Sequence, residues 1–251
     1  MNAPKKVSAK ELRSRLLRSV AVGAAFAALA AVAFIRVSNG PEEDGAPRLL
    51  RRAFLINESV WSRLSSPSRL SVAKPAPPDG HAPRVNGDLG LESPADLEHY
   101  AVAVESGGRR LSLPIADLRA LSRVSYSTEF RCIEGWSDVT RFSGTRFSAF
   151  MDAYRVGRKP DGSLFRYVGL ETPDRKYYVS LDMKSMLHPQ TLLAFEENGR
   201  ALSQENGAPV RLVIPIKYGI KSLKRVGRIF FSDERPPDYW AEQGYDWYSG
   251  L

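Results

Sequence analysis

The chain has 251 residues, of which 43% are hydrophobic and 25% are charged. This composition can bury the core of one large domain with appendages, or of two small domains. Cys132 is the single cysteine, which excludes an internal disulfide and a zinc or iron–sulfur site bound by several cysteines of this chain. The three histidines are scattered without metal-ligand spacing. The net charge of +8 suits a negatively charged ligand or partner, although part of it belongs to the N-terminus.

An apolar run at residues 19–35 follows a basic segment at residues 1–18 that includes Lys5 and Lys6. As a helix the run would rise about 25 Å, which is at the short end for a bilayer core. The basic flank before it and the acidic residues after it predict a single-pass protein of the cytoplasmic membrane with the remainder in the periplasm. Small residues at 28–30 offer a cleavage site, so a removable signal is the alternative. The apolar run continues beyond these residues to residue 35, which favours an uncleaved anchor.

Residues 36–83 are predicted to be a linker that contains one helix, at residues 48–63. Five prolines between residues 67 and 83 predict an extended segment that wraps over a neighbouring domain. The apolar stripe expected on the helix consists of Leu50, Phe54, Val60 and Leu64.

Residues 84–251 are predicted to form the main domain. Strand-like patterns alternate with short helical ones, without an internal repeat or a regular βαβ order. This predicts an α+β domain built on mixed or antiparallel sheets. The expected strands are residues 100–105, 109–113, 125–133, 166–172, 176–181, 210–216 and 228–232, and the expected helices are residues 114–121 and 147–154.

The segment around Cys132 is the first candidate site. A thiolate binds soft metals or attacks electrophiles, and the guanidinium of Arg131 would favour it if the two side chains face each other. The strand expected at residues 125–133 would place Cys132 near its end and Glu134 on the same face. Glu134 would then act as a general acid or base, or pair with Arg131 or Arg141. Taken alone, a single cysteine is more often a small buried hydrophobe.

Two later segments contain the groups of an anion site. Residues 206–211 lead into a strand that contains Arg211. Residues 217–225 combine a turn at Gly219 with several cationic side chains, so N–H groups and cations could surround a phosphate. The alternative is a basic surface cluster on a membrane-tethered, non-catalytic module that binds an acidic partner or lipid headgroups. Nucleic-acid binding is disfavoured because the basic residues are not interleaved with aromatic ones. The aromatic residues at 239–248 would be packing surface or a cavity wall.

Six motifs occur in a fixed order within residues 84–251. They are Arg131-Cys132-Ile133-Glu134-Gly135-Trp136, Tyr167-Val168-Gly169-Leu170-Glu171-Thr172, His188-Pro189-Gln190-Thr191-Leu192-Leu193, Asn206-Gly207-Ala208-Pro209-Val210-Arg211, Lys217-Tyr218-Gly219-Ile220-Lys221-Ser222 and Glu234-Arg235-Pro236-Pro237. This series resembles the sulfite oxidase family of molybdenum enzymes, and within it the bacterial branch of protein-methionine-sulfoxide reductases. With six motifs in order, the buried-hydrophobe interpretation of Cys132 is abandoned.

The resemblance implies a sulfite-oxidase-like, molybdopterin-binding fold with molybdenum and a pyranopterin as cofactor. It implies that Cys132 is the catalytic residue and the molybdenum ligand, which agrees with the affinity of soft sulfur for this metal. The cofactor-binding residues that it implies are Asn86, Gly87, Asp88, Thr172, Asn206, Arg211, Ser222, Leu223 and Lys224.

The expected activity is two-electron oxygen-atom transfer on a small S- or N-oxide substrate, or the reverse oxidation. The chain has no haem-binding sequence, so a separate electron-transfer protein, expected to contain haem, would exchange the electrons. Gly135-Trp136-Ser137 stands where animal and plant sulfite oxidases carry an Asn-Arg-Arg run that serves sulfite binding, so sulfite is not implied as the substrate.

Overall fold

The computed structural model describes residues 8–43, 45–64, 66–79 and 81–250. The chain divides into two compact units, residues 1–53 and 54–251. Lys5 and Lys6 of the expected basic segment lie outside the described residues.

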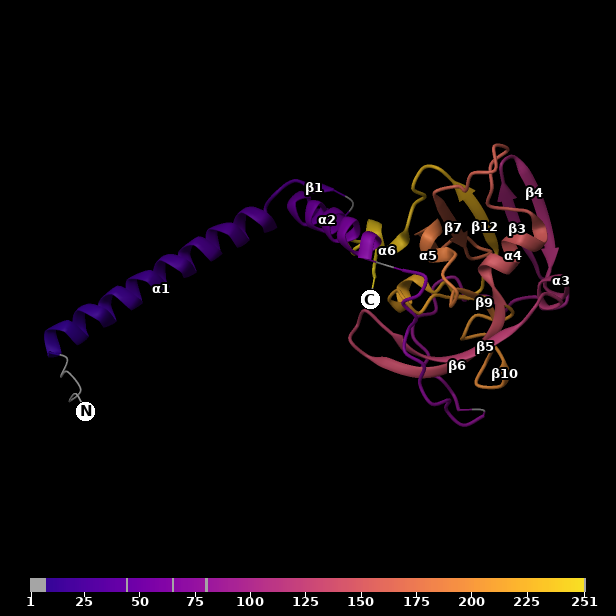
Figure 1. Ribbon diagram of the computed structural model, residues 1–251, viewed down its shortest axis with the longest axis horizontal. Coiled ribbons are helices and arrows are strands. Elements are labelled where there is room, and N and C mark those ends of the chain that lie inside the picture. The colour runs from indigo at the N-terminus through magenta and orange to yellow at the C-terminus, as the bar shows by residue number, and fades with distance from the viewer. Residues whose placement is uncertain (1–7, 44, 65, 80, 251) are drawn as a thin grey trace. The chain divides into compact units, whose positions relative to one another are not determined.

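Helix α1 (Ala9–Ser38) contains the whole predicted apolar run and extends it at both ends (Figure 1). It begins where the Ser8 hydroxyl accepts a hydrogen bond from the Glu11 backbone N–H (3.2 Å), an N-cap. None of its residues is buried. In length and composition the helix can cross a membrane.

Helix α2 (Arg48–Leu64) follows a short antiparallel pair, β1 (Glu42–Glu43) and β2 (Ala46–Pro47). It confirms the helix predicted at residues 48–63. The stripe expected on it does not face a core, because three of its four members are exposed and Phe54 is half-buried. The exposed members are Leu50, Val60 and Leu64.

Two five-stranded sheets build the second unit. The first has the strand order β4-β3-β12-β7-β8. Strand β12 pairs with β3 in parallel and the other pairs are antiparallel, so this sheet is mixed, as predicted. Its strands are β3 (Ala101–Ser106), β4 (Arg109–Pro114), β7 (Tyr167–Glu171), β8 (Tyr178–Asp182) and β12 (Arg228–Ser232).

The second sheet is antiparallel, with the order β10-β9-β6-β5 and β11 paired to β9. The β6–β9 register shifts at Gly144, where a Cβ would overlap the Leu193 carbonyl, so only glycine permits this close approach. The strands are β5 (Val124–Arg131), β6 (Ser137–Arg146), β9 (Leu192–Glu197), β10 (Arg200–Ala201) and β11 (Arg211–Val213).

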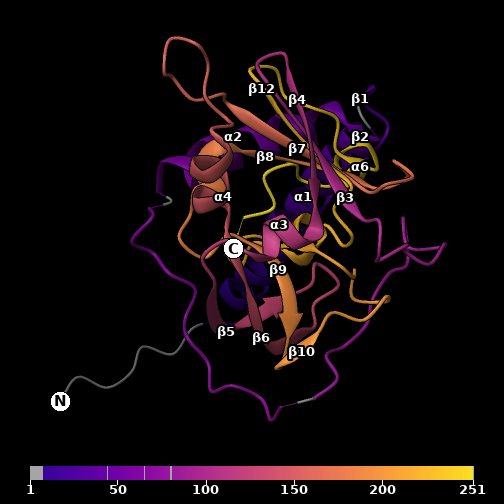
Figure 2. The same cartoon turned by 90° about the vertical axis from the view of Figure 1, so that its right-hand side faces the viewer.

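One hydrophobic core is shared by the two sheets, which lie one above the other in Figures 1 and 2. Val104 and Leu170 come from the first sheet, Phe195 and Leu212 from the second. Three short helices add residues to this core: α3 (Ile115–Arg119), α4 (Phe147–Tyr154) and α5 (Met183–Met186). Helix α6 (Tyr239–Glu242) and the 3-10 turn η1 (Gly219–Lys221) contribute no residue to it.

Two predicted strands continue at least two residues beyond the end of the observed ones. Strand β5 ends at Arg131 because the next residue enters a hydrogen-bonded loop. Strand β11 ends at Val213, two residues before Pro215, which has no N–H to donate to a sheet.

The proline-rich segment packs on the second unit, as predicted. The Ser71 N–H donates to Gln190 Oε1 (2.7 Å), and Ala73 forms a β-bridge with Thr128. Residues 54–83 therefore belong to the compact unit, which begins before the domain boundary expected at residue 84.

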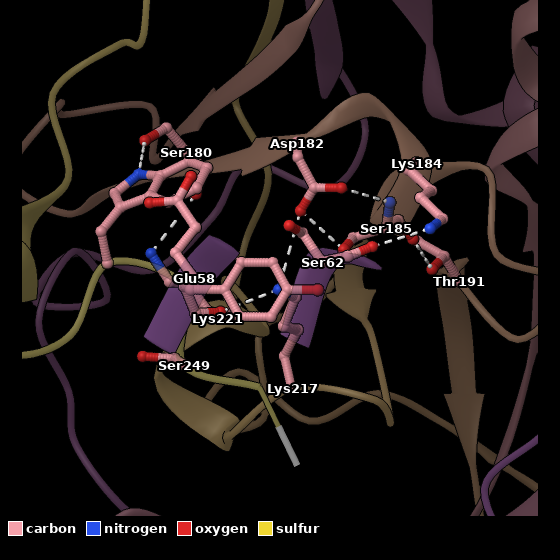
Figure 3. A network of polar contacts seen from close by, with 12 residues as sticks. Glu58, Ser62, Ser180, Asp182, Lys184, Ser185, Thr191, Lys217, Lys221 and Ser249 are labelled. Atoms are coloured by element: carbon pink, nitrogen blue, oxygen red, sulfur yellow. Dashed lines mark hydrogen bonds and ion pairs between the residues drawn. The ribbon is translucent and has the colours of Figure 1, made fainter. Parts of the chain in front are cut away.

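A buried ion pair joins η1 to the C-terminal segment. The side chains of Lys221 and Asp238 are 1% and 2% exposed. Lys221 Nζ also donates to the Ser180 carbonyl (3.3 Å), and Asp238 Oδ2 accepts from the Ser180 N–H (2.9 Å). Beside this pair, Lys217 Nζ donates to the Tyr248 carbonyl (2.8 Å) and lies 3.6 Å from Asp182 Oδ2 (Figure 3). Both lysines thus fix the end of the chain to strand β8.

Replacing Asp238 by alanine should lower the free energy of unfolding by about 3–5 kcal/mol, because it leaves the Lys221 ammonium buried without its partner. Urea denaturation measures this. The control is Asp233→Ala, which removes a more exposed pair with Lys159 (3.1 Å) and should cost below about 1 kcal/mol. Equal losses in the two variants would contradict the importance given to the buried pair.

Candidate active site

Cys132 starts the loop at residues 132–136 that joins β5 to β6. Its N–H donates to the Trp136 carbonyl (2.9 Å), and the Gly135 N–H donates to the Cys132 carbonyl (3.1 Å). Gly135 has a φ of +89°, which glycine adopts without strain. The loop therefore fixes Cys132 just after the strand, not within it as predicted. The residue is 7% exposed.

The Asn86 amide connects Cys132 to Glu134. Its Nδ2 lies 3.8 Å from Cys132 Sγ and donates to Glu134 Oε2 at 3.2 Å. Trp136 Nε1 donates to the same oxygen (3.0 Å). These hydrogen bonds, the one from Trp136 first, lower the pKa of Glu134. The carboxylate is thus an acceptor that orients an amide beside the sulfur.

Two expectations about Glu134 are wrong. It does not share a strand face with Cys132, because it lies in the loop. It does not pair with the neighbouring arginines either, since Arg131 binds Glu129 (2.9 Å) and Arg141 binds Asp79.

A cleft opens beside Cys132. Its empty space is about 1040 Å³, a volume that includes open solvent at its mouth. The cleft brings together seven of the predicted site residues, which come from four separate segments of the second unit. They are Asn86, Gly87, Cys132, Asn206, Arg211, Ser222 and Lys224.

Arg211 is a buried cation in the wall of this cleft. Its guanidinium carbon lies 5.5 Å from the ring centroids of both Phe130 and Phe142. Its NH1 donates to the Asn206 carbonyl (3.2 Å), whereas its buried Nε has no hydrogen-bond partner among the described residues. Burial lowers its pKa to about 10, against the opposing effect of Glu197, so Arg211 stays charged at neutral pH. A buried cation with an unused donor is typical of a site for an anion.

Lys224 is the second cation of the cleft. Its Nζ donates to the carbonyls of Asn86 (2.8 Å) and Gly87 (2.9 Å), which ties the 86–87 turn to the basic loop. Burial first, and then the charge of Arg211, lower its pKa to about 8. Glu197 also lines the cleft, and burial raises its pKa despite Arg211. The positive charge therefore prevails over the negative charge at this end of the cleft near neutral pH.

Gly207 permits the two basic segments to touch. Its φ is +96°, and a Cβ there would lie 2.7 Å from the Arg225 nitrogen and 2.9 Å from the Lys224 Cα. On the other segment, Ser222 Oγ accepts from the Ile214 N–H (3.3 Å). The close packing of these segments positions Lys224.

Three predicted cofactor-binding residues do not line the cleft. The Thr172 hydroxyl donates to Asp174 Oδ1 (2.6 Å). Leu223 is fully buried and its carbonyl accepts from the Leu212 N–H (2.9 Å). The Asp88 carbonyl accepts from the N–H of Leu91 (2.8 Å). In this structure Thr172, Leu223 and Asp88 make hydrogen bonds within the protein and are not part of the cleft lining.

Tyr177, Trp240 and Tyr245 also line the cleft and form its aromatic wall. The Tyr177 hydroxyl donates to the Ile220 carbonyl (2.6 Å) and accepts from Trp240 Nε1 (3.1 Å). Tyr245 stacks edge-on against Trp240 at 5.2 Å between centroids. Two of the C-terminal aromatics are thus a cavity wall, whereas Trp247 is core. No local sequence pattern indicates Tyr177, because its place in the cleft depends on the pairing of distant strands.

The expected alternative of a basic surface cluster at residues 217–225 is wrong. Lys217, Lys221 and Arg225 are each at most 4% exposed. The first two are bound as described above, and Arg225 donates to Gln204 Oε1 (2.7 Å). They are structural cations, which leaves Lys224 of this segment to bind a ligand in the cleft.

The donor set fits a molybdenum–pterin cofactor. A soft thiol suits a thiophilic metal, and the charged Arg211 and Lys224 suit a phosphate. Among the described residues no three His, Cys, Asp or Glu side chains are grouped to hold a metal ion. A metal bound by Cys132 would therefore need further ligands from outside this set, which a dithiolene provides.

Comparison with known proteins agrees with this chemistry. A family model described as the oxidoreductase molybdopterin binding domain matches residues 90–240. The catalytic subunit of a protein-methionine-sulfoxide reductase from Ralstonia nicotianae is 32% identical over 95% of this chain and 75% of its own length. The corresponding subunit from Campylobacter jejuni is 32% identical over 56% of this chain and 52% of its own length. The chain thus spans only about half the length of several curated relatives it matches.

Among solved structures, the sulfane dehydrogenase SoxCD from Paracoccus pantotrophus is similar, with a TM-score of 0.50 and 21% identity. The alignment covers 56% of this chain and 40% of that chain. The likeness concerns the fold and supports the expected sulfite-oxidase-like architecture of mixed sheets and short helices.

A side chain at Gly207 should displace the loop that carries Lys224. We expect Gly207→Ala to lower the free energy of unfolding by about 1–3 kcal/mol and to weaken anion binding in the cleft, because of its positive φ and the close backbone. Denaturation and calorimetric titration with pyrophosphate measure the two effects. Gly108→Ala is the control, since Gly108 also has a positive φ but no atom within 4 Å of a Cβ. Equal loss of pyrophosphate affinity in both variants would contradict the role of Gly207.

Proposed function

Because this chain belongs to the family of oxidoreductases with a molybdopterin binding domain, we propose that the cleft beside Cys132 is its molybdenum–pterin site. The proposed activity is two-electron oxygen-atom transfer on a small S- or N-oxide substrate. The observation that carries the proposal is the meeting of one buried thiol, a buried arginine and a half-buried lysine in a single cleft.

Cys132 would hold the metal through its sulfur. The loop hydrogen bonds fix its backbone, and the Asn86 amide nitrogen lies 3.8 Å from Sγ. Glu134 orients that amide. The chain therefore prepares the sulfur as a ligand before any metal binds.

Arg211 and Lys224 would hold the phosphate of the pterin. The unused Nε of Arg211 and the Lys224 ammonium supply charge, and Asn206 and Ser222 add polar groups beside them. The pair Phe130 and Phe142 fixes the Arg211 plane, so little side-chain entropy is lost on binding.

When bound, the cofactor supplies the two-electron redox chemistry and accepts or donates the oxygen atom. The wall of Tyr177, Trp240 and Tyr245 limits the access of water and offers an apolar surface to a substrate. Burial raises the pKa of Tyr177, so its hydroxyl stays protonated and keeps its hydrogen bond to the Ile220 carbonyl.

The substrate would be a sulfoxide, as the names of the relatives suggest, or another small oxide. The same relatives are named catalytic subunits, which supports a separate electron-transfer partner, and we propose that it contains haem. Helix α1 would anchor the chain in the cytoplasmic membrane with the catalytic unit on the periplasmic side. A screen of sulfoxides and N-oxides with a dye as electron donor, and of reduced substrates with a dye as acceptor, tests substrate and direction. Failure of every oxide and every reduced compound in the loaded protein would overturn the proposed activity.

Cys132→Ser should abolish molybdenum binding and catalysis while the fold persists, because a hydroxyl is a poor ligand for a thiophilic metal. Plasma mass spectrometry of protein purified from a host that makes the cofactor measures the metal, and circular dichroism checks the fold. Ser143→Ala, which changes a side chain outside the cleft, should retain the wild-type molybdenum content. Stoichiometric molybdenum in the Cys132 variant would rule out this sulfur as the ligand.

Anion affinity of the cofactor-free cleft should fall as the pH rises from 7 to 9. The pKa of Lys224 is lowered to about 8, so its ammonium is charged below this pH and neutral above it. Calorimetric titration with pyrophosphate at several pH values measures the decline. In Lys224→Met the affinity should be lower and nearly independent of pH over this interval. An unchanged pH profile in that variant would show that another group binds the anion.

A further inference from the structure

Helix α2 is amphipathic, but its apolar side faces away from the domain. Ile56, Val60 and Leu64 follow one another at helical spacing and are 66%, 45% and 51% exposed. Leu55 and Trp61 are also exposed, at 56% and 44%. An amphipathic helix of a globular protein normally buries this side.

The polar side of the same helix contacts the rest of the second unit. Asn57 Nδ2 donates to Asp246 Oδ2 (2.8 Å), and Glu58 Oε1 accepts from Arg235 NH2 (2.6 Å). The Ser62 carbonyl accepts from Lys184 Nζ at 2.8 Å (Figure 3).

The polar contacts fix the helix with its apolar side outward. Rotating α2 to bury that side would break these three contacts. A contiguous apolar surface of this kind marks a contact with a membrane or with another protein.

Three observations favour a membrane. Helix α2 begins nine residues (39–47) after helix α1, which can span a bilayer. The exposed residues Arg52 and Arg63 lie beside the apolar side in the helical projection, where they would meet anionic headgroups. Trp61 adds the aromatic residue that is enriched at membrane interfaces.

We propose that helix α2 lies in the plane of the membrane interface, with Ile56, Val60 and Leu64 among the lipid chains. The inference rests on the anchoring role proposed for α1. The lipid-bound helix is attached through Asp246 and Arg235 to the segment that contains Trp240 and Tyr245. It therefore holds the cleft in one orientation relative to the bilayer.

Tryptophan quenching by brominated lipids tests this. The full chain is reconstituted in vesicles of phosphatidylcholine and phosphatidylglycerol, with or without bromine on the acyl chains, and emission is compared between wild type and Trp61→Phe. We expect bromine to reduce the emission of the wild type and to have little effect on Trp61→Phe, because Trp136 and Trp240 line the cleft and Trp247 is buried. Equal quenching of both proteins, or quenching of neither, would overturn the proposal.

Charged residues on the apolar side of α2 should release the helix from the membrane. The double variant Ile56→Asp with Val60→Asp should lose the quenching of Trp61 and keep dye-linked activity, because neither residue lines the cleft. Leu97→Asp, which charges an apolar residue of similar exposure (48%) outside α2, should quench like wild type. Persistence of quenching in the double variant would contradict insertion of this side. If that variant does not fold, the comparison with Trp61→Phe still decides.

Retention of the chain after carbonate extraction reports on the α1 anchor separately. A chain that is retained but shows no Trp61 quenching refutes the α2 proposal and leaves the anchor standing. Dye-linked activity of either protein reports on the catalytic proposal independently of both.

Discussion

The buried pair of Lys221 and Asp238 is the constraint on which the rest of the catalytic unit depends. Lys221 belongs to the turn that precedes Ser222 and Lys224 at the cleft, and Asp238 caps the helix that carries Trp240. Moving two charges out of water is costly, so the pair persists only where its remaining donors and acceptors are also satisfied. Backbone groups of Ser180 meet that need, so strand β8 connects the turn that contains Lys221 to the segment that contains Asp238.

The cleft divides its cations by function. Lys217, Lys221 and Arg225 are bound within the protein and hold the fold together, whereas Arg211 and Lys224 line the cleft. A local sequence pattern presents all of them as one basic cluster. Burial and pairing divide these cations into two groups. A cation that already has a partner adds little to the electric field at a bound ligand, whereas an incompletely paired cation adds much.

Much of the fold follows from local patterns. Alternation identified the hairpin of β3 and β4, and helical spacing identified α2 and α4, because both depend on near neighbours. The ordered motifs indicated the Cys132 loop and the two basic segments. Local patterns do not show that Tyr177 lines the cleft, or that Thr172 and Leu223 do not line it. These positions depend on which distant strands pair. The prediction for Glu134 is wrong because strand β5 ends at Arg131. Glu134 lies in the following loop, whose glycine and internal hydrogen bonds end the strand.

Helix α2 shows the same dependence on distant contacts. Its spacing predicts an apolar stripe correctly, but which side meets the domain is decided by Asp246, Arg235 and Lys184, far along the chain. These residues come from the C-terminal segment and α5, and the first two flank the aromatic wall. The three contacts lie along the inner side of the helix and fix its orientation together, because a rotation of the helix would break all of them at once. The segment that closes the cleft is therefore also the segment that fixes the helix with its apolar side turned outward, so the orientation of α2 and the shape of the cleft depend on the same residues.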